Sequence, residues 1–85
     1  MDDKIHVKEA LEVFGKITTR GVKTEDGHVL NGITAKSDFD GYTIVLCNDY
    51  VTLTVFFHNK FTFDYTSVKE RDSFIEKMAV IKKAS

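Results

Sequence analysis

The chain lacks proline and tryptophan, and it holds one cysteine and five glycines among its 85 residues. The lone Cys47 makes no internal disulfide, which is typical of proteins in a reducing cytoplasm. No apolar run approaches the roughly 20 residues that a membrane-spanning helix needs. The acidic start, Met1–Lys4, lacks the apolar core of a signal peptide. We therefore expect a cytoplasmic protein with no membrane segment.

The composition is that of an ordinary globular domain, with 42% hydrophobic and 29% charged residues. A chain of this length predicts one domain over residues 1–85. Folding buries about 60% of the surface of such a chain, which is enough for one core between two layers.

The formal net charge of −1 conceals an uneven distribution of charge. Residues 25–66 carry two lysines against six acidic residues, whereas both ends of the chain are weakly basic. A sheet that binds nucleic acid needs lysine and arginine opposite the phosphates. The acidic middle segment therefore argues against nucleic acid as a partner.

Apolar residues at spacings of three and four predict a helix near each end of the chain. The two apolar stripes consist of Val7, Ala10, Leu11, Val13, Phe14 and Ile17, and of Val68, Phe74, Ile75, Met78 and Ile81. Ser67, followed three residues later by Glu70, predicts a capping box at the start of the second helix. Gly15 costs the first helix up to about 1 kcal/mol relative to alanine, and we expect close packing to explain it.

Alternating apolar and polar residues predict four strands, over residues 28–37, 42–47, 50–57 and 61–65. The turns between them fall at residues 38–41, 48–49 and 58–60. These turns pair Ser37 with Tyr42, Cys47 with Tyr50, and Phe57 with Phe61.

Paired residues share one face of a sheet, and the three turns agree on how the residues divide. One face is apolar and carries Val29, Ile33, Ala35, Tyr42, Ile44, Leu46, Val51, Leu53, Val55, Phe57, Phe61, Phe63 and Tyr65. The other is rich in threonine and carries Thr34, Lys36, Thr43, Val45, Cys47, Tyr50, Thr52, Thr54, Phe56, Thr62 and Asp64. The predicted fold class is α+β, a two-layer sandwich of order α-β-β-β-β-α. Its four-stranded antiparallel meander has both helices on one face.

No residue pattern in the chain predicts catalysis, a cofactor or a metal ion. The three histidines (His6, His28 and His58) lack the spacing of zinc ligands. Cys47 has no base beside it on the predicted sheet. We expect no catalytic, cofactor-binding or metal-binding residues. An enzyme would instead show a pocket that unites two or more of His28, His58, Asp40 and Tyr65.

Three runs of the chain, Val7–Phe14, Phe39–Thr43 and Phe56–Tyr65, resemble a small family of uncharacterised gammaproteobacterial proteins. The resemblance covers nearly the whole chain. It implies a bacterial cytoplasmic protein and an unknown function. It assigns no activity, cofactor or active site, and so transfers no functional residue.

The threonine-rich face is the candidate functional surface, through Thr43, Val45, Thr52, Thr54, Phe56 and Thr62. A flat surface with few lysines and glutamates resembles an interface more than a bare surface. We expect a non-enzymatic protein-interaction module that binds another protein or itself, as a homodimer through this face. The first alternative is that water covers the face. A second is a module that binds a small ligand or nucleic acid, in a groove between helix and sheet or on the basic positions of the helices. An enzyme comes last.

Overall fold

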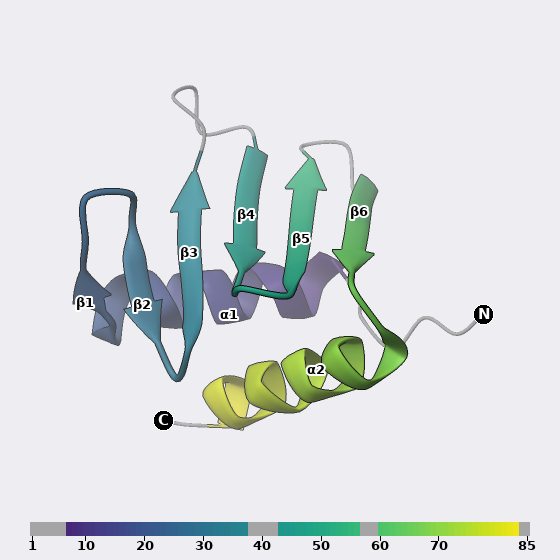
Figure 1. Ribbon diagram of the computed structural model, residues 1–85. Coiled ribbons are helices and arrows are strands. Elements are labelled where there is room, and N and C mark those ends of the chain that lie inside the picture. The colour runs from purple at the N-terminus through teal and green to yellow at the C-terminus, as the bar shows by residue number, and fades with distance from the viewer. Residues whose placement is uncertain (1–6, 38–42, 57–59, 84–85) are drawn as a thin grey trace.

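The computed structural model describes residues 7–37, 43–56 and 60–83. Helix α1 (Val7–Arg20) opens the fold and helix α2 (Val68–Lys83) closes it (Figure 1). Between them run β1 (Val22–Lys23), β2 (His28–Leu30), β3 (Ile33–Ser37), β4 (Thr43–Cys47), β5 (Val51–Phe56) and β6 (Lys60–Tyr65).

The strands form one open sheet in which each pairs antiparallel with the next along the chain. This confirms the α+β class and the antiparallel meander. The predicted count of four strands is wrong, because the described sheet has six.

A tight turn at Asn31 and Gly32 accounts for one of the two additional strands, and β1 is the other. Both residues have positive φ, 52° and 80°, and they join Leu30 to its partner Ile33. An Asn-Gly pair with two positive φ angles is the preferred two-residue hairpin turn. The predicted strand over residues 28–37 is therefore two strands, β2 and β3.

The hairpin also moves one residue to the other face of the sheet. Val29 pairs with Thr34, so it lies on the threonine-rich face and not on the apolar face as predicted. Leu30 packs against the core instead. Val22 of β1 pairs with Val29 and therefore lies on the same threonine-rich face.

The three predicted registers are each wrong by two residues. Ser37 pairs with Ile44, Cys47 with Thr52, and Phe61 with Val55. Because side chains alternate with a period of two, an even shift leaves the described residues of β3 to β6 on their predicted faces. The predicted turns at 38–41 and 58–60 lie wholly or largely outside the described residues.

The turn between β4 and β5 shows why the register moved. The Asn48 side-chain oxygen accepts hydrogen bonds from the backbone N–H groups of Tyr50 and Val51, both at 2.9 Å. The Asn48 N–H also donates to the Val51 carbonyl at 2.9 Å. The two-residue loop is therefore Asp49–Tyr50, one position later than predicted.

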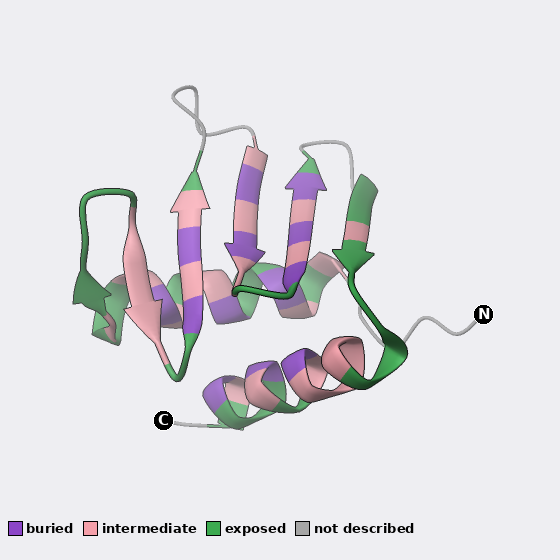
Figure 2. Cartoon of the chain, viewed as in Figure 1, coloured by how far each residue is buried: buried purple, intermediate pink, exposed green. Residues whose placement is uncertain are grey.

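One hydrophobic core lies between the helices and one face of the sheet (Figure 2). Its buried residues are Ile33, Ala35, Ile44, Leu46, Val51, Leu53 and Val55 of the sheet, Ala10, Val13 and Ile17 of α1, and Phe74, Met78 and Ile81 of α2. The helices contact each other, with α1 crossing behind the strands in Figure 1. Both helices therefore lie on the same side of the sheet, as predicted.

Two apolar residues of the predicted helix stripes are exposed. Leu11 is 49% exposed and Val68 is 54% exposed. With 3.6 residues per turn, each lies about a third of a turn from the centre of the buried stripe on its helix. The spacing of apolar residues therefore predicts both helices correctly, but it assigns too many residues to the buried face of each helix.

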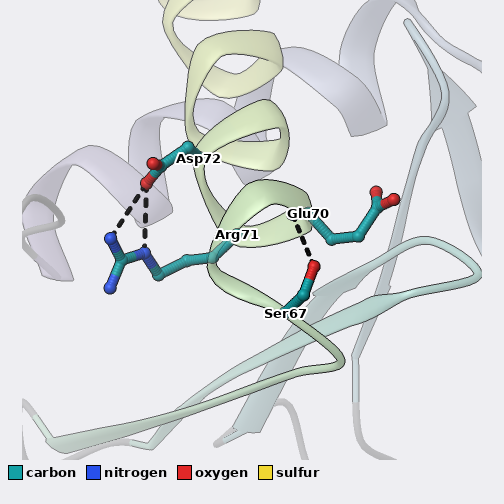
Figure 3. Close-up of polar contacts among 4 residues, drawn as sticks. All are labelled: Ser67, Glu70, Arg71 and Asp72. Carbon is teal, nitrogen blue, oxygen red and sulfur yellow. Dashed lines mark hydrogen bonds and ion pairs between the residues drawn. The ribbon is translucent and has the colours of Figure 1, made fainter.

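The start of α2 is fixed by the Ser67 cap (Figure 3) and by a contact of Arg71 with β6. The Glu70 N–H donates to Ser67 Oγ at 3.3 Å, which confirms the Ser67 half of the predicted capping box, whereas the Glu70 carboxylate points away from Ser67 (Figure 3). Arg71 makes an ion pair with Asp72, Nη2 to Oδ1, at 3.0 Å. Its guanidinium also lies over the Tyr65 ring, 5.5 Å from the centroid. These contacts join the helix to the last strand.

Replacement of Gly15 or of Gly32 by alanine should change the free energy of unfolding, and the two changes should have opposite signs. A Cβ on Gly15 would meet no atom within 4 Å, so the expected close packing is wrong. We predict that Gly15→Ala raises the free energy of unfolding by about 0.5–1 kcal/mol, because alanine favours the helix. Gly32→Ala should lower it by about 1–2 kcal/mol, because φ is 80°. Urea denaturation measures both, and a loss of stability in Gly15→Ala would contradict the first expectation.

Candidate functional site

The candidate site is the open face of the sheet, which is the face opposite both helices. The cross-strand pairs arrange it in three adjacent rows. The rows are Thr43–Phe56–Lys60, Lys36–Val45–Thr54–Thr62, and Val22–Val29–Thr34–Cys47–Thr52–Asp64. The structure thus places all six predicted interaction residues side by side.

Within residues 7–37, 43–56 and 60–83, no helix lies over the open face. Thr43, Val45, Thr52 and Thr54 are nevertheless only partly exposed, since neighbouring side chains on the flat sheet shield them. Figure 2 shows these half-buried positions alternating with buried ones along β4 and β5. Phe56, at 38% exposure, is the large apolar side chain at the end of β5.

Sequence reasoning missed Val22 and Val29 as members of this face. Val22 is 72% exposed and Val29 lies beside it on β2. The signal that could have found them is the Asn31-Gly32 dipeptide, the strongest short-range sign of a hairpin. Splitting the strand there assigns Val29 to the open face.

Charge on the open face is sparse and lies toward its margins. Among the described strand residues, its charged members are Lys36 on β3 and Lys60 and Asp64 on β6. The described acidic residues of the middle segment otherwise lie in turns, at Glu25, Asp26 and Asp49. The centre of the face is therefore uncharged, and two lysines do not form a track for phosphates.

The residues considered for chemistry do not converge. Cys47 lies half-buried on the open face between Thr34 and Thr52, and not opposite Tyr50 as predicted. Tyr50 is exposed in the β4–β5 turn. His28 is on the helix side of β2, beside Ala35, and three strands separate it from Tyr65 on β6.

The other candidates, His6, His58 and Asp40, lie outside the described residues. In the ranges that the structure describes, no three histidine, cysteine or acidic side chains are placed to hold a metal ion. No helix there is both long and apolar enough to cross a membrane.

A groove of about 440 Å³ lies between the two helices, whereas the sequence suggested one between helix and sheet. It is lined by Glu9, Val13, Ile75, Met78, Ala79, Lys82 and Lys83. Lys82 Nζ lies 2.9 Å from Glu9 Oε2 and 3.9 Å from Glu12 Oε1, and Lys16 Nζ donates to the Lys82 carbonyl at 2.6 Å. These contacts balance the charge of Lys82 within the protein. The ion pairs of Lys82 therefore join α2 to α1 beside the groove.

Comparison with known proteins matches the chain to one family, but it finds no relative with an assigned activity. A family model described as protein of unknown function (DUF3081) matches residues 5–85. This confirms the resemblance to a family of unknown function over nearly the whole chain. No curated protein and no solved structure matches the chain.

The contact between the helices should be visible in the titration of Lys82. The hydrogen bond to Glu9 raises the Lys82 pKa above its ordinary value of 10.5, since the carboxylate favours the charged amine. The stability it contributes is complete below pH 10.5 and is lost as the pH rises through the higher pKa of the folded state. We predict that Glu9→Gln lowers this pKa, as measured by NMR at the Lys82 Cε.

Glu12→Gln is the matched control for this titration. Glu12 acts on Lys82 only through its charge, at 3.9 Å, and is the smallest of the contributions that raise the pKa. It should therefore lower the Lys82 pKa by less than Glu9→Gln does. Equal effects of the two variants would show that the hydrogen bond is unimportant.

Proposed function

The chain belongs to the DUF3081 family, whose function is unknown, and from its surfaces we propose that it is a small non-enzymatic cytoplasmic protein-interaction module. The open face is its contact surface, and a second copy of the chain is the partner to test first. The observation that carries this proposal is the uncharged centre of a flat sheet face left uncovered by both helices.

The composition of the open face supports contact with protein more than contact with water alone. Interface centres are depleted in charged residues, and charged groups lie at their rims. Val45, Thr52 and Thr54 lie in the middle of the face on β4 and β5, Phe56 lies at the end of β5, and Lys36 and Asp64 lie on the flanking strands β3 and β6. Charges of both signs let the same surface meet a second copy without a strong like-charge field.

The area of the open face limits how tightly two copies of the chain can associate through it. The six strands, of two to six residues each, cover a flat area of about 430 Å² at ordinary strand spacing. A stable interface uses about 800 Å² on each partner. Contact through this face alone is therefore weak, and its population depends on protein concentration.

Lysine substitutions on the open face, one in the middle of β4 and one at the end of β5, test the proposal. Val45→Lys or Phe56→Lys would bring a charge into the contact, and desolvating it opposes association. We predict that either change raises the dissociation constant at least about tenfold, which is 1.4 kcal/mol. Sedimentation equilibrium over a range of concentrations measures it.

Val80→Lys is the matched control, because Val80 is 59% exposed on α2 and far from the open face in the fold. It should leave the association unchanged. If Val45→Lys and Phe56→Lys also leave the oligomer mass unchanged, the open face is not the contact surface. Circular dichroism spectra must first show that all three variants are folded.

A further inference from the structure

Strand β6 forms one edge of the sheet, so one side of its backbone has no partner strand among the described residues (Figure 1). Five of its six residues are exposed, and it contains neither proline nor glycine. Native proteins normally blunt such an edge, because free N–H and C=O groups can pair with another strand. The opposite edge, β1, has only two residues. A pairing edge of useful length therefore lies at β6.

The edge is held in place by its own domain. Strand β6 pairs with β5 along all six residues. On the helix side, the Phe63 ring lies 6.2 Å from the Phe74 ring, and Arg71 lies over Tyr65. Because β6 is already ordered, pairing it with another strand costs little conformational entropy.

The sequence of β6, Lys60-Phe61-Thr62-Phe63-Asp64-Tyr65, is complementary to itself about Thr62. In an antiparallel pair centred on this residue, Lys60 of one copy lies opposite Asp64 of the other, and the same contact occurs twice. Phe61 lies opposite Phe63, also twice, and Thr62 meets Thr62. Each of these pairs shares a face, as antiparallel partners must.

We propose that β6 is a homodimerisation edge, which pairs antiparallel with β6 of a second copy about Thr62. The two open sheets continue as one sheet of twelve strands, related by a twofold axis through Thr62. This contact extends the sheet in its own plane and leaves the open face uncovered. It therefore does not depend on binding through that face.

The charges on β6 fit this contact and have no ion-pair partner among the described residues of one copy. Lys60 and Asp64 are about 13 Å apart along one strand, which is too far for an ion pair. Among the residues that the structure describes, neither forms an ion pair with any other group. In the proposed dimer each finds an opposite charge directly across the strand pair.

The same two charges select the register of the pair. A shift of one residue places apolar side chains opposite polar ones on the wrong face. A shift of two residues that pairs Phe63 with Phe63 places Asp64 opposite Thr62 and Lys60 opposite Thr66. Both ion pairs are lost in that arrangement, so the contact centred on Thr62 is favoured over it.

Crosslinking through cysteine distinguishes this edge contact from association through the open face. In a Cys47→Ser background, Thr62→Cys places two thiols directly across the proposed strand pair, within the Cα separation that a disulfide spans. Thr54→Cys is the matched control, because Thr54 pairs with Thr62 one strand further in. Across the edge its two copies are about 14 Å apart, beyond disulfide reach.

We expect mild oxidation to link most of the Thr62→Cys chains and few of the Thr54→Cys chains. The reverse result, with linkage at Thr54 alone, would overturn the edge contact and support the open face. No linkage in either variant, with a monomeric wild-type chain at all concentrations, would also overturn it. Val45→Lys and Phe56→Lys test the open face separately and should not change linkage at Thr62.

Exchange of the two charges tests the register. Lys60→Asp and Asp64→Lys each place like charges opposite one another, and each should raise the dimer dissociation constant about tenfold or more. An equimolar mixture of these two variants should form a heterodimer, and the double variant K60D/D64K should recover the homodimer. Lys23→Asp on β1 is the control and should have no effect. Failure of both the mixture and the double variant to associate, with all chains folded, would overturn the proposed pairing.

Discussion

The two-residue period of the β-strand is the constraint on which the rest of this structure depends. Each strand presents alternate side chains to opposite faces, and the antiparallel pairs keep those faces aligned from strand to strand. One face therefore gathers Ile33, Leu46 and Leu53 into a core that both helices cover. The other face is threonine-rich and uncovered for the same reason. The alternation of side chains along the strands therefore produces both the core and the candidate contact surface.

A meander that does not close into a barrel leaves two edges, and they differ in this protein. The hairpin at Asn31 and Gly32 extends the sheet on one side until it ends in the two-residue strand β1. On the other side, β6 is longer and is braced by Phe74 and Arg71 of α2. An edge becomes a specific contact when its side chains select one partner and one register. In β6, the placement of Lys60 and Asp64 on either side of Thr62 supplies that selection.

Two described cations hold elements of the fold together. Lys82 of α2 contacts Glu9 of α1, and Arg71 of α2 lies over the Tyr65 ring of β6. Several acidic residues of the sheet region lie in turns, where water solvates them. The centre of the open face consequently has no charged group, which suits contact with protein better than contact with a polyanion.

The sequence by itself determined the fold class, both helices and the division of residues between the faces of β3 to β6, because apolar periodicity is local information. The six residues from Thr43 to Thr62 proposed for the contact surface were found in this way. Tertiary structure decided the registers and the rotation of each helix, whereas the hairpin at Asn31 could have been predicted from its Asn-Gly dipeptide. The turn at Asn48 shows the reason: one side-chain oxygen that accepts two backbone hydrogen bonds moves the loop by one residue and the register by two. Alternation does not detect an even shift, so only the packed structure decided which residues pair across the sheet, and it placed Lys60 in β6 and not in the predicted turn.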